Sequence, residues 1–326
     1  MKKCFLVLLS LLLLWAAPAL AEMPHMGICI YNEKDTFMNS LSTRLQGLAP
    51  GRATVAVTDA QNDQNKQNDQ IGQMLDAGVD VLIVNPVDRT AAVYLIQMAA
   101  KREVPIVFIN REPLQSDLDL YEHAYYVGID PKEQGTLSGQ MAAQYFLNTP
   151  AADKNRDGVL QLVIVKGEPG HQDAELRTQY AIKALFENEV AVELISQDTA
   201  MWERSLGQEK MAALINAYGE RIECVLSNND DMALGAIDAL KAAGYFSQER
   251  YIPVLGIDAT APAMEALRAG TLYATVVNDA QNQANAAFEL ALLLSSGERV
   301  NSENFPYEMN NKVVYIKSRS ITAADE

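Results

Sequence analysis

The segment "ECVLSNNDDMALGAIDALKAAG" (223–244) contains the unit that decides the fold of this chain. It begins with a short apolar run, which is typical of a buried strand. Polar Asn and Asp residues follow, and then a stretch with the length of a helix ends in glycine, as helices often do. A strand followed at once by a helix is half of a strand–helix–strand unit and predicts a parallel sheet.

The same unit recurs along the whole chain. Beside the apolar run at 223–228, comparable runs occupy 26–31, 53–58, 79–84, 105–110, 124–129, 160–165, 190–195, 252–257, 274–279 and 313–316. Most are separated by helix-length segments such as 37–48 and 67–78. Eleven strands are too many for one small sheet, and 326 residues suffice for two domains. The sequence predicts an α/β fold of two doubly wound lobes, divided near residues 128–130.

Polar side chains follow nearly every predicted strand, at the edge of a parallel sheet where ligands bind. The segments "NEKDTF" (32–37), "NREP" (110–113), "KGEPGHQDAELR" (166–177) and "NNDD" (228–231) are examples. For a single Asn or Asp the simpler interpretation is a helix N-cap. Polar residues after six strands favour a pocket for a ligand rich in hydroxyl groups, since amides and carboxylates have fixed donors and acceptors.

The N-terminus has the pattern of a secretory signal peptide at residues 1–21. Lys2 and Lys3 precede an apolar run, and small residues at 19–21 offer a cleavage site after Ala21. The alternative is a membrane anchor, but the run at 4–20 is short for a bilayer span and contains Pro18. We therefore expect an exported protein, located in the periplasm of a bacterium.

Charge and cysteine content limit the partners further. The formal net charge is −16 at pH 7, which disfavours binding to nucleic acid or to anionic lipid. Cys29 and Cys224 lie beyond the signal peptide in two different predicted strands. We expect two buried free thiols, and a disulfide between them is the alternative in an oxidising compartment.

The stretch "DKNRDGVLQ" (153–161) has the spacing of a calcium loop. Its oxygen-bearing side chains alternate as in positions 1, 3, 5 and 9 of an EF-hand, with Gly158 at position 6. Position 12, which should be glutamate, is Ile164, and an apolar strand follows instead of a helix. The residues alone leave two alternatives open: a surface turn without metal, or a calcium site with its last ligand elsewhere.

Five segments identify a family resemblance: "QNDQNKQNDQI" (61–71), "GEPGHQDAELRT" (167–178), "DTAMW" (198–202), "SNNDDMALGA" (227–236) and "NDAQNQA" (278–284). From about Gly27 to Ile316 the chain resembles the periplasmic D-galactose/D-glucose-binding proteins of bacterial ABC importers. The resemblance implies the periplasmic binding protein type 1 fold, with two Rossmann-like lobes joined by a three-strand hinge. The implied N-terminal lobe is 22–128 plus 280–313, and the C-terminal lobe is 129–279 plus 314–326. It also implies a monomer that delivers sugar to a membrane permease, with a chemoreceptor as a further partner.

The resemblance assigns a sugar site residue by residue. Asp35 would accept a hydrogen bond from the 4-hydroxyl of either epimer, while Phe37 and Trp202 would cover the two faces of the sugar. His171 and Arg177 would donate and Asp173 would accept, and Arg111 stands where the family more often has lysine. The implied sugar-binding residues are Asp35, Phe37, Asn110, Arg111, His171, Asp173, Arg177, Trp202, Asn229, Asp258 and Asn278.

The resemblance also implies a structural Ca²⁺ ion, with Glu223 as the distant ligand. Glu223 and the loop both precede strands, so they would be neighbours at the end of the lobe away from the sugar. The implied ligands are Asp153, Asn155, Asp157, the carbonyl of Val159, Gln161 and Glu223.

A hexose-binding protein is not the only interpretation of these residues. Asp35, Asp173 and Asp258 could serve as acid/base groups of a glycosidase, but the sequence contains no G-x-S-x-G or H-E-x-x-H motif. A sugar-responsive repressor would carry a helix-turn-helix where the signal peptide stands. A different monosaccharide or a methyl-galactoside remains an alternative ligand. We expect no enzymatic activity, and the sequence does not rank glucose against galactose.

Overall fold

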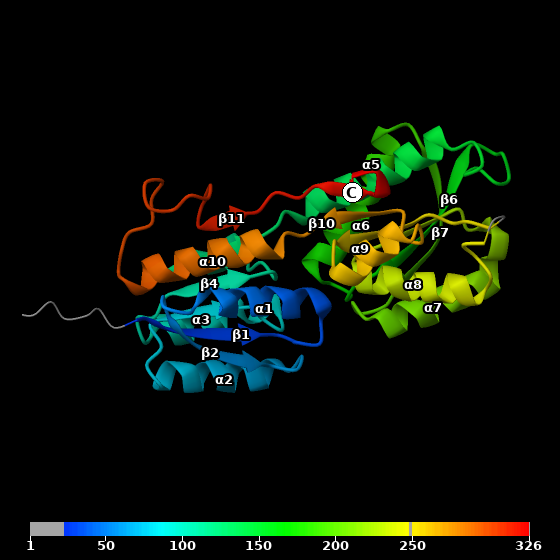
Figure 1. Cartoon of the computed structure of the whole chain (residues 1–326). Helices are drawn as coiled ribbons and strands as arrows, with labels where there is room; N and C mark the ends of the chain where they lie inside the picture. Colours follow the sequence, from blue (N-terminus) through cyan, green and yellow to red (C-terminus); the bar gives the residue numbers. More distant parts are fainter. Residues whose placement is uncertain (1–22, 248–249, 326) are drawn as a thin grey trace, which may run out of the picture.

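The structure is a computed structural model that describes residues 23–247 and 250–325. The predicted signal peptide at residues 1–21 lies outside the described residues. The described chain forms two lobes side by side, each a six-stranded sheet with helices on both faces (Figure 1). The predicted two-lobed α/β fold is therefore confirmed.

The first lobe contains a sheet in the order β11-β5-β4-β3-β1-β2, in which all neighbours are parallel. Its strands are β1 (His25–Ile30), β2 (Thr54–Asp59), β3 (Val81–Val84), β4 (Ile106–Ile109), β5 (Ala124–Gly128) and β11 (Val313–Tyr315). Its helices are α1 (Thr36–Leu48), α2 (Gln64–Asp76), η1 (Arg89–Ala91), α3 (Ala92–Ala100), α4 (Gln115–Leu118) and α10 (Ala280–Ser295). Helices α1 and α10 pack on one face of the sheet, and α2 and α3 pack on the other. Burial of both faces explains why these strands are apolar runs instead of alternating patterns.

The second lobe contains a sheet in the order β12-β10-β9-β8-β6-β7. Its strands are β6 (Val159–Lys166), β7 (Ala191–Thr199), β8 (Cys224–Ser227), β9 (Val254–Asp258), β10 (Ala274–Val277) and β12 (Ser320–Thr322). Its helices are α5 (Pro131–Asn148), α6 (Gln172–Glu187), α7 (Arg204–Tyr218), η2 (Gly219–Arg221), α8 (Asp230–Ala242), α9 (Ala261–Arg268) and η3 (Ala323–Asp325). Helices α7 and α8 cover one face, and α5 and α6 cover the other.

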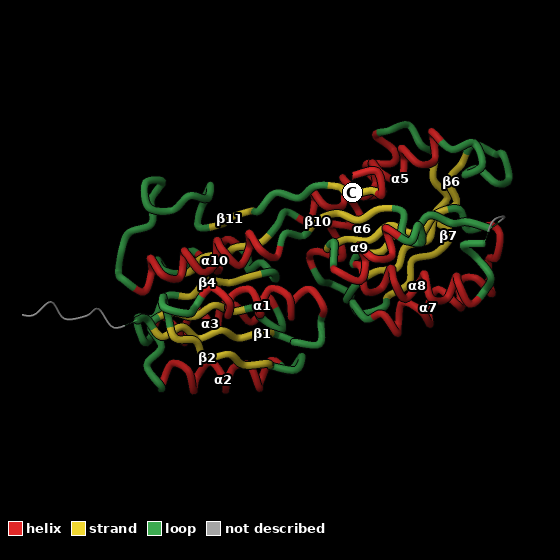
Figure 2. The backbone as a smooth tube through the Cα atoms, in the orientation of Figure 1, coloured by secondary structure: helices red, strands yellow, loops and turns green. Residues whose placement is uncertain are grey.

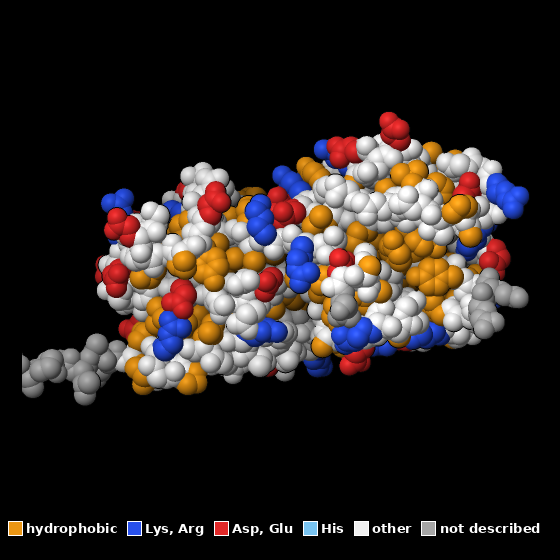
Figure 3. Space-filling model, turned by 45° about the horizontal axis from the view of Figure 1, so that its top comes forward, with side chains coloured by type: hydrophobic (Ala, Val, Ile, Leu, Met, Phe, Trp, Pro, Cys, Tyr) orange, Lys and Arg blue, Asp and Glu red, His pale blue; other side chains and the backbone are white. Residues whose placement is uncertain are grey.

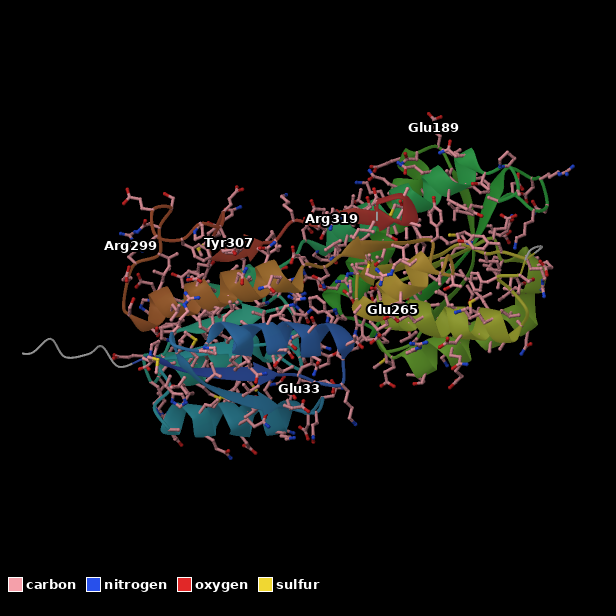
Figure 4. The ribbon with its side chains drawn as sticks, viewed as in Figure 1. Glu33, Glu189, Glu265, Arg299, Tyr307 and Arg319 are labelled. Atoms are coloured by element: carbon pink, nitrogen blue, oxygen red, sulfur yellow. The ribbon has the colours of Figure 1, made fainter. Side chains whose placement is uncertain are left out.

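The chain crosses between the lobes after β5, after β10 and after β11 (Figure 2). The third crossing corrects the predicted boundary at residue 313. Strand β11 pairs with β5 in the first sheet, and Val314 and Ile316 are buried in the first lobe. The crossing therefore lies after Ile316. Arg319 is on this crossing, and Glu33, in the loop after β1, lies at the end of the first lobe that faces the second (Figure 4).

All eleven predicted strands are present, with ends shifted by a few residues, and one strand was missed. Strand β12 has only three residues and pairs antiparallel with β10. The second sheet is therefore mixed, whereas the sequence predicted a parallel sheet. Strand β7 extends through the polar residues Ser196, Gln197 and Asp198, beyond a register shift against β6. It is an edge strand in which no residue is buried, so the apolar pattern does not mark its end.

Cys29 in β1 and Cys224 in β8 are both buried and free. They lie in the sheets of different lobes, so the expectation of free thiols is confirmed and the alternative disulfide is excluded. No helix in the described ranges combines the length and apolar character needed to cross a membrane. Acidic and basic side chains are interspersed over both lobes on the face shown in Figure 3.

Candidate functional site

A pocket lies between the lobes, where the carboxyl ends of strands from both sheets meet. The cavity that its side chains enclose has a volume of about 30 Å³. All eleven residues predicted for the sugar site line it, together with one residue that the sequence analysis missed. The lining residues are Tyr31, Asp35, Phe37, Asn110, Arg111, His171, Asp173, Arg177, Trp202, Asn229, Asp258 and Asn278.

The missed residue, Tyr31, fixes the orientation of Asp35. Its hydroxyl donates to Asp35 Oδ2 over 2.6 Å, while Asp35 Oδ1 accepts from the backbone N–H of Met38 at 2.9 Å. Burial, with the Asp35 carboxylate beside it, raises the pKa of Tyr31 well above its usual value, so Tyr31 stays a donor. Tyr31 ends the apolar run 26–31, so its pattern is that of a strand residue and not of a polar residue after a strand. An aromatic residue directly after "ICI" was the signal for Tyr31.

Arg111 joins the two lobes at the edge of the pocket. Its side chain is 5% exposed, and its guanidinium lies 4.3 Å from the centre of the Tyr31 ring. Nη1 donates to the carbonyl of Val87, and Nη2 donates to Glu168 Oε2 in the second lobe over 3.0 Å. A planar guanidinium can make these contacts together, whereas lysine has a single point charge.

In the second lobe, His171 caps α6 and lines the pocket. Its Nδ1 accepts from the backbone N–H of Asp173 at 3.1 Å. Burial, with Arg111 and Arg177 nearby, lowers the pKa of His171 well below its usual value. A neutral imidazole that accepts at Nδ1 carries its proton on Nε2, which leaves one donor for a ligand.

Arg177 is held by three acceptors of its own lobe. Nε donates to Gln134 Oε1 at 2.8 Å, Nη1 to the carbonyl of Asn228 at 2.9 Å, and Nη2 to Asp173 Oδ2 at 3.3 Å. The Asp173–Arg177 pair is buried on both sides. Burial raises the pKa of Asp173, and Arg177 opposes that shift. Such a pair keeps a fixed geometry because breaking it would leave a buried charge alone.

Trp202 lies against a surface that only glycine permits. A Cβ atom on Gly167 would lie 2.3 Å from the indole ring. The ring of His171 meets Trp202 edge-on, with centres 5.0 Å apart. Phe37, from the first lobe, is 7% exposed and packs into the core of that lobe. The pocket therefore has an aromatic ring from each lobe.

The remaining polar residues are also tied to their surroundings. Asn229 caps α8 by accepting from Met232 N–H at 3.0 Å and donates to the carbonyl of Trp202 at 3.2 Å. Asn278 donates to Asp258 Oδ1 at 3.0 Å, and burial raises the pKa of Asp258 well above its usual value. Asn110 takes a left-handed conformation with φ of 62°.

A polar residue after a strand can therefore be a helix N-cap and a pocket-lining residue at the same time. Asp35, His171 and Asn229 each cap a helix, and each also lines the pocket. One side chain can do both because a carboxylate, imidazole or amide has more than one polar position.

The predicted calcium loop lies at the amino ends of β6 and β8, remote from the pocket. Glu223 is beside it, as expected, with Oε1 accepting from Lys154 N–H at 2.6 Å and Oε2 from Gln161 N–H at 3.1 Å. Asp153 accepts from the N–H groups of Asp157 and Gly158 within the loop. Within residues 23–247 and 250–325, no three His, Cys, Asp or Glu side chains form a metal-type cluster. The expected ligand set also needs amide and main-chain oxygens.

Two α/β lobes, three crossings and a pocket of polar groups and aromatic rings define a two-lobed ligand-binding protein. The family model described as "Periplasmic binding protein domain" matches residues 26–299. The chain belongs to this family, in the class of sugar-binding proteins of ABC importers, which bind a substrate and are not enzymes. Membership of this family gives no support to the glycosidase interpretation.

Three relatives illustrate the range of the family. The D-galactose/methyl-galactoside binding periplasmic protein MglB of Haemophilus influenzae is 38% identical over 92% of this chain and 90% of that protein. A putative rhizopine-binding protein of Rhizobium meliloti is 33% identical over 96% of this chain and 97% of that protein. A solved ABC transporter solute binding protein from Bacillus halodurans with bound myo-inositol has a TM-score of 0.77 and 29% identity, covering 93% of this chain and 96% of that chain.

Proposed function

We propose that this protein binds D-galactose or D-glucose in the periplasm and delivers the sugar to the permease of an ABC importer. The observation that carries the proposal is the convergence of all eleven predicted sugar residues on one pocket. The 38% identity to a galactose/methyl-galactoside binding protein supports it.

A pyranose has a hydroxyl edge and C–H faces, and the pocket has groups that suit both. The hydroxyl edge of the sugar would meet charged groups such as Asp35, Asp173 and Arg177, which make the stronger kind of hydrogen bond. The C–H faces would meet Phe37 and Trp202 without loss of hydrogen bonds. Asp35 presents acceptor positions beyond those used by Tyr31 and Met38, so it could accept from an axial or an equatorial 4-hydroxyl.

A fluorescence titration tests this proposal directly. Trp15 lies in the predicted signal peptide, so Trp202 is the only tryptophan of the chain beyond it. A saturable change in tryptophan emission with D-glucose or D-galactose, absent with D-ribose, is the expected result. A flat response to both hexoses would overturn the proposed ligand.

The second candidate ligand is a cyclic polyol, because the solved relative from Bacillus halodurans contains myo-inositol. Its hydroxyls would meet the same carboxylates and amides, but it has no ring oxygen. The same titration with myo-inositol and with methyl β-D-galactoside separates these candidates. Tighter binding of myo-inositol than of either hexose would favour the polyol.

We propose that the bound sugar holds the two lobes closed. Arg111 pairs with Glu168 across the cleft, and Gln172 donates to Glu112 Oε2 at 2.9 Å. A ligand that touches both lobes favours the closed form by its differential affinity. A permease, and as a further proposal a chemoreceptor, would then recognise the closed surface. Binding of each partner with and without sugar, measured by pull-down, tests this step.

We also propose that the loop at 153–161 and Glu223 hold a structural Ca²⁺ ion. The donors would be the side-chain oxygens of Asp153, Asn155, Asp157, Gln161 and Glu223, with the carbonyl of Val159. The ion would neutralise the charges of Asp153, Asp157 and Glu223. A chelator should lower the melting temperature by several degrees, and added Ca²⁺ should restore it. Glu223→Gln should remove that response. An unchanged melting curve would contradict a bound ion.

We propose export through cleavage after Ala21. The mass of the protein recovered from the periplasm should correspond to a chain that begins at Glu22. An uncleaved mass in the membrane fraction would support an anchor instead.

A further inference from the structure

The turn that carries Asp258 has an unusual backbone. Asp258 has φ of 129° and Ala259 has φ of 55°, and neither is glycine. Such conformations are unfavourable for residues with a side chain, and they persist only where the surrounding structure holds them. Asp258 lines the pocket, so the cause of this conformation bears on ligand binding.

Two residues behind the pocket hold the turn. The backbone N–H of Thr260 donates to Asp230 Oδ2 at 2.8 Å, and the backbone N–H of Ala259 donates to the hydroxyl of Thr275 at 3.3 Å. The Thr275 hydroxyl itself donates to Asp230 Oδ1 at 2.8 Å. The two residues that follow Asp258 are therefore bonded to a single connected pair from α8 and β10.

This pair is built into the core of the second lobe. Asp230 and Thr275 are fully buried, and neither is among the described residues that line the pocket. A Cβ atom on Gly256 would lie 2.2 Å from Asp230 Oδ1, so glycine is required in β9 for the carboxylate to fit.

Burial makes the carboxylate of Asp230 unfavourable. Its carboxylate accepts from the Thr260 N–H and the Thr275 hydroxyl, and neither donor is a cation. Burial raises the pKa of Asp230 to about 6, with Asp231 adding to the shift. Burial raises the pKa of the neighbouring Asp258 most, Arg177 lowers it, and Asp230 and Asp35 raise it further. A buried acid without a positive partner destabilises the fold. The hydrogen bonds that Asp230 accepts from Thr260 and Thr275 offset part of this cost.

We propose that Asp230 and Thr275 are positioning residues that hold the turn at 258–260 in the conformation that directs the Asp258 carboxylate at the ligand. The identity of the ligand rests on the proposed function, whereas the clamp formed by Asp230 and Thr275 does not.

Thr275→Val is the first variant, because it removes the hydroxyl and keeps the shape. We expect the Kd for D-galactose, measured by Trp202 fluorescence, to rise about tenfold. Thr275→Ser keeps the hydroxyl and should bind like the wild type. Thr271→Val is the matched control, since Thr271 is a buried threonine of the same lobe whose hydroxyl donates to the Ala266 carbonyl. Its Kd should stay within about twofold.

A double-mutant cycle with Asp258→Asn separates positioning from general support. If Thr275 acts through the Asp258 carboxylate, Thr275→Val should weaken binding by less than about twofold in the Asp258→Asn background. An equal loss in both backgrounds would mean that Thr275 supports the lobe as a whole, which overturns the proposal.

Amide hydrogen exchange in the ligand-free protein gives a second measurement that does not depend on the sugar. In Thr275→Val and in Asp230→Asn, the amides of Ala259 and Thr260 should exchange about tenfold faster, while those of β8 are unchanged. Unchanged exchange at the turn would overturn the clamp. If the wild type binds neither hexose, the proposed sugar is wrong, and the exchange result still decides for or against the clamp.

Discussion

The two walls of the pocket differ in how they hold their charged groups. In the second lobe, Arg177 is bonded by three acceptors of its own lobe. In the first lobe, Arg111 reaches across the cleft to Glu168, and its Nε is buried without a hydrogen-bond partner among the described residues. Arg177 in the second lobe is thus pre-organised, whereas the contacts of Arg111 would be completed only by the proposed closure of the lobes. We expect a ligand to bind the second lobe first, since less ordering is needed there.

The largest effect should come from breaking the pre-organised wall. Arg177→Met would leave Asp173 buried without its positive partner, which costs about 3–5 kcal/mol in stability. Ligand affinity should fall by about a thousandfold or more, because the donor and the orientation of Asp173 are both lost. Urea denaturation and isothermal titration calorimetry measure the two effects.

Arg221→Met is the control for that variant. Arg221 pairs with Glu193 on the surface of the same lobe, and both side chains are about half exposed. Its removal should change stability by less than about 1 kcal/mol and leave binding unchanged. Retention of affinity within tenfold in Arg177→Met would show that the second wall is not pre-organised by this residue.

An intermediate effect should come from the contact that joins the walls. Glu168→Gln removes the charge that pairs with Arg111 while keeping an acceptor, so affinity should fall about tenfold. Small-angle scattering of the ligand-free variant should show a more open average shape. Glu175→Gln is the matched control, because Glu175 pairs with Lys166 inside the second lobe. Equal loss in both variants would argue against a role in closure.

A smaller effect should come from Tyr31 in the first wall. Tyr31→Phe removes the donor to Asp35 Oδ2 and leaves the ring under Arg111. Asp35 keeps its bond from Met38 N–H, so we expect affinity to fall by only about three- to tenfold. The ratio of the Kd values for glucose and galactose should change as well, because both epimers would use Asp35. An unchanged Kd for both sugars would contradict a positioning role.

The smallest effect should be a pH dependence of stability caused by Asp230, which lies behind the second wall. The pKa of Asp230 in the folded state is about 6, above the usual value of 3.8. As the pH falls, Asp230 is therefore protonated in the folded state before it is protonated in the unfolded state. The folded state therefore gains stability relative to the unfolded state as the pH falls from about 6 to about 4. In that window, the free energy of unfolding of the wild type should rise relative to that of Asp230→Asn by up to about 1 kcal/mol for each pH unit that the pH falls. Urea midpoints at pH 7, 6 and 5 check the sign.

The sequence predicted the strands of both lobes because burial on two faces makes each one a continuous apolar run. It failed at β12 and at the end of β7, where the strands are short, antiparallel or exposed. Their pairing depends on neighbours far away in the chain. The boundary at 313 was wrong for the same reason, since only pairing with β5 assigns β11 to the first lobe.

The residues that line the pocket were predictable, because most of them directly follow strands. The residues that lie behind them were not. The eleven lining residues were named because the family resemblance fixes each position. Tyr31, Asp230 and Thr275 were missed because their roles depend on contacts between separate elements, and nothing local marks them. A buried aspartate at the start of α8 reads as an ordinary helix N-terminus.

The late position of α10 has a consequence for synthesis. This helix contributes Phe288 and Leu290 to the core of the first lobe, against strands that precede it by about 150 residues or more. The sheet of the second lobe, apart from β12, lies entirely between these two parts of the chain. During translation or translocation, the part of the first lobe's sheet that α10 covers must stay exposed while strands β6 to β10 emerge, although α1 can already pack on the same face. Contacts so distant in sequence slow folding. This exposed part of the first lobe is therefore where an incomplete chain would need protection from aggregation.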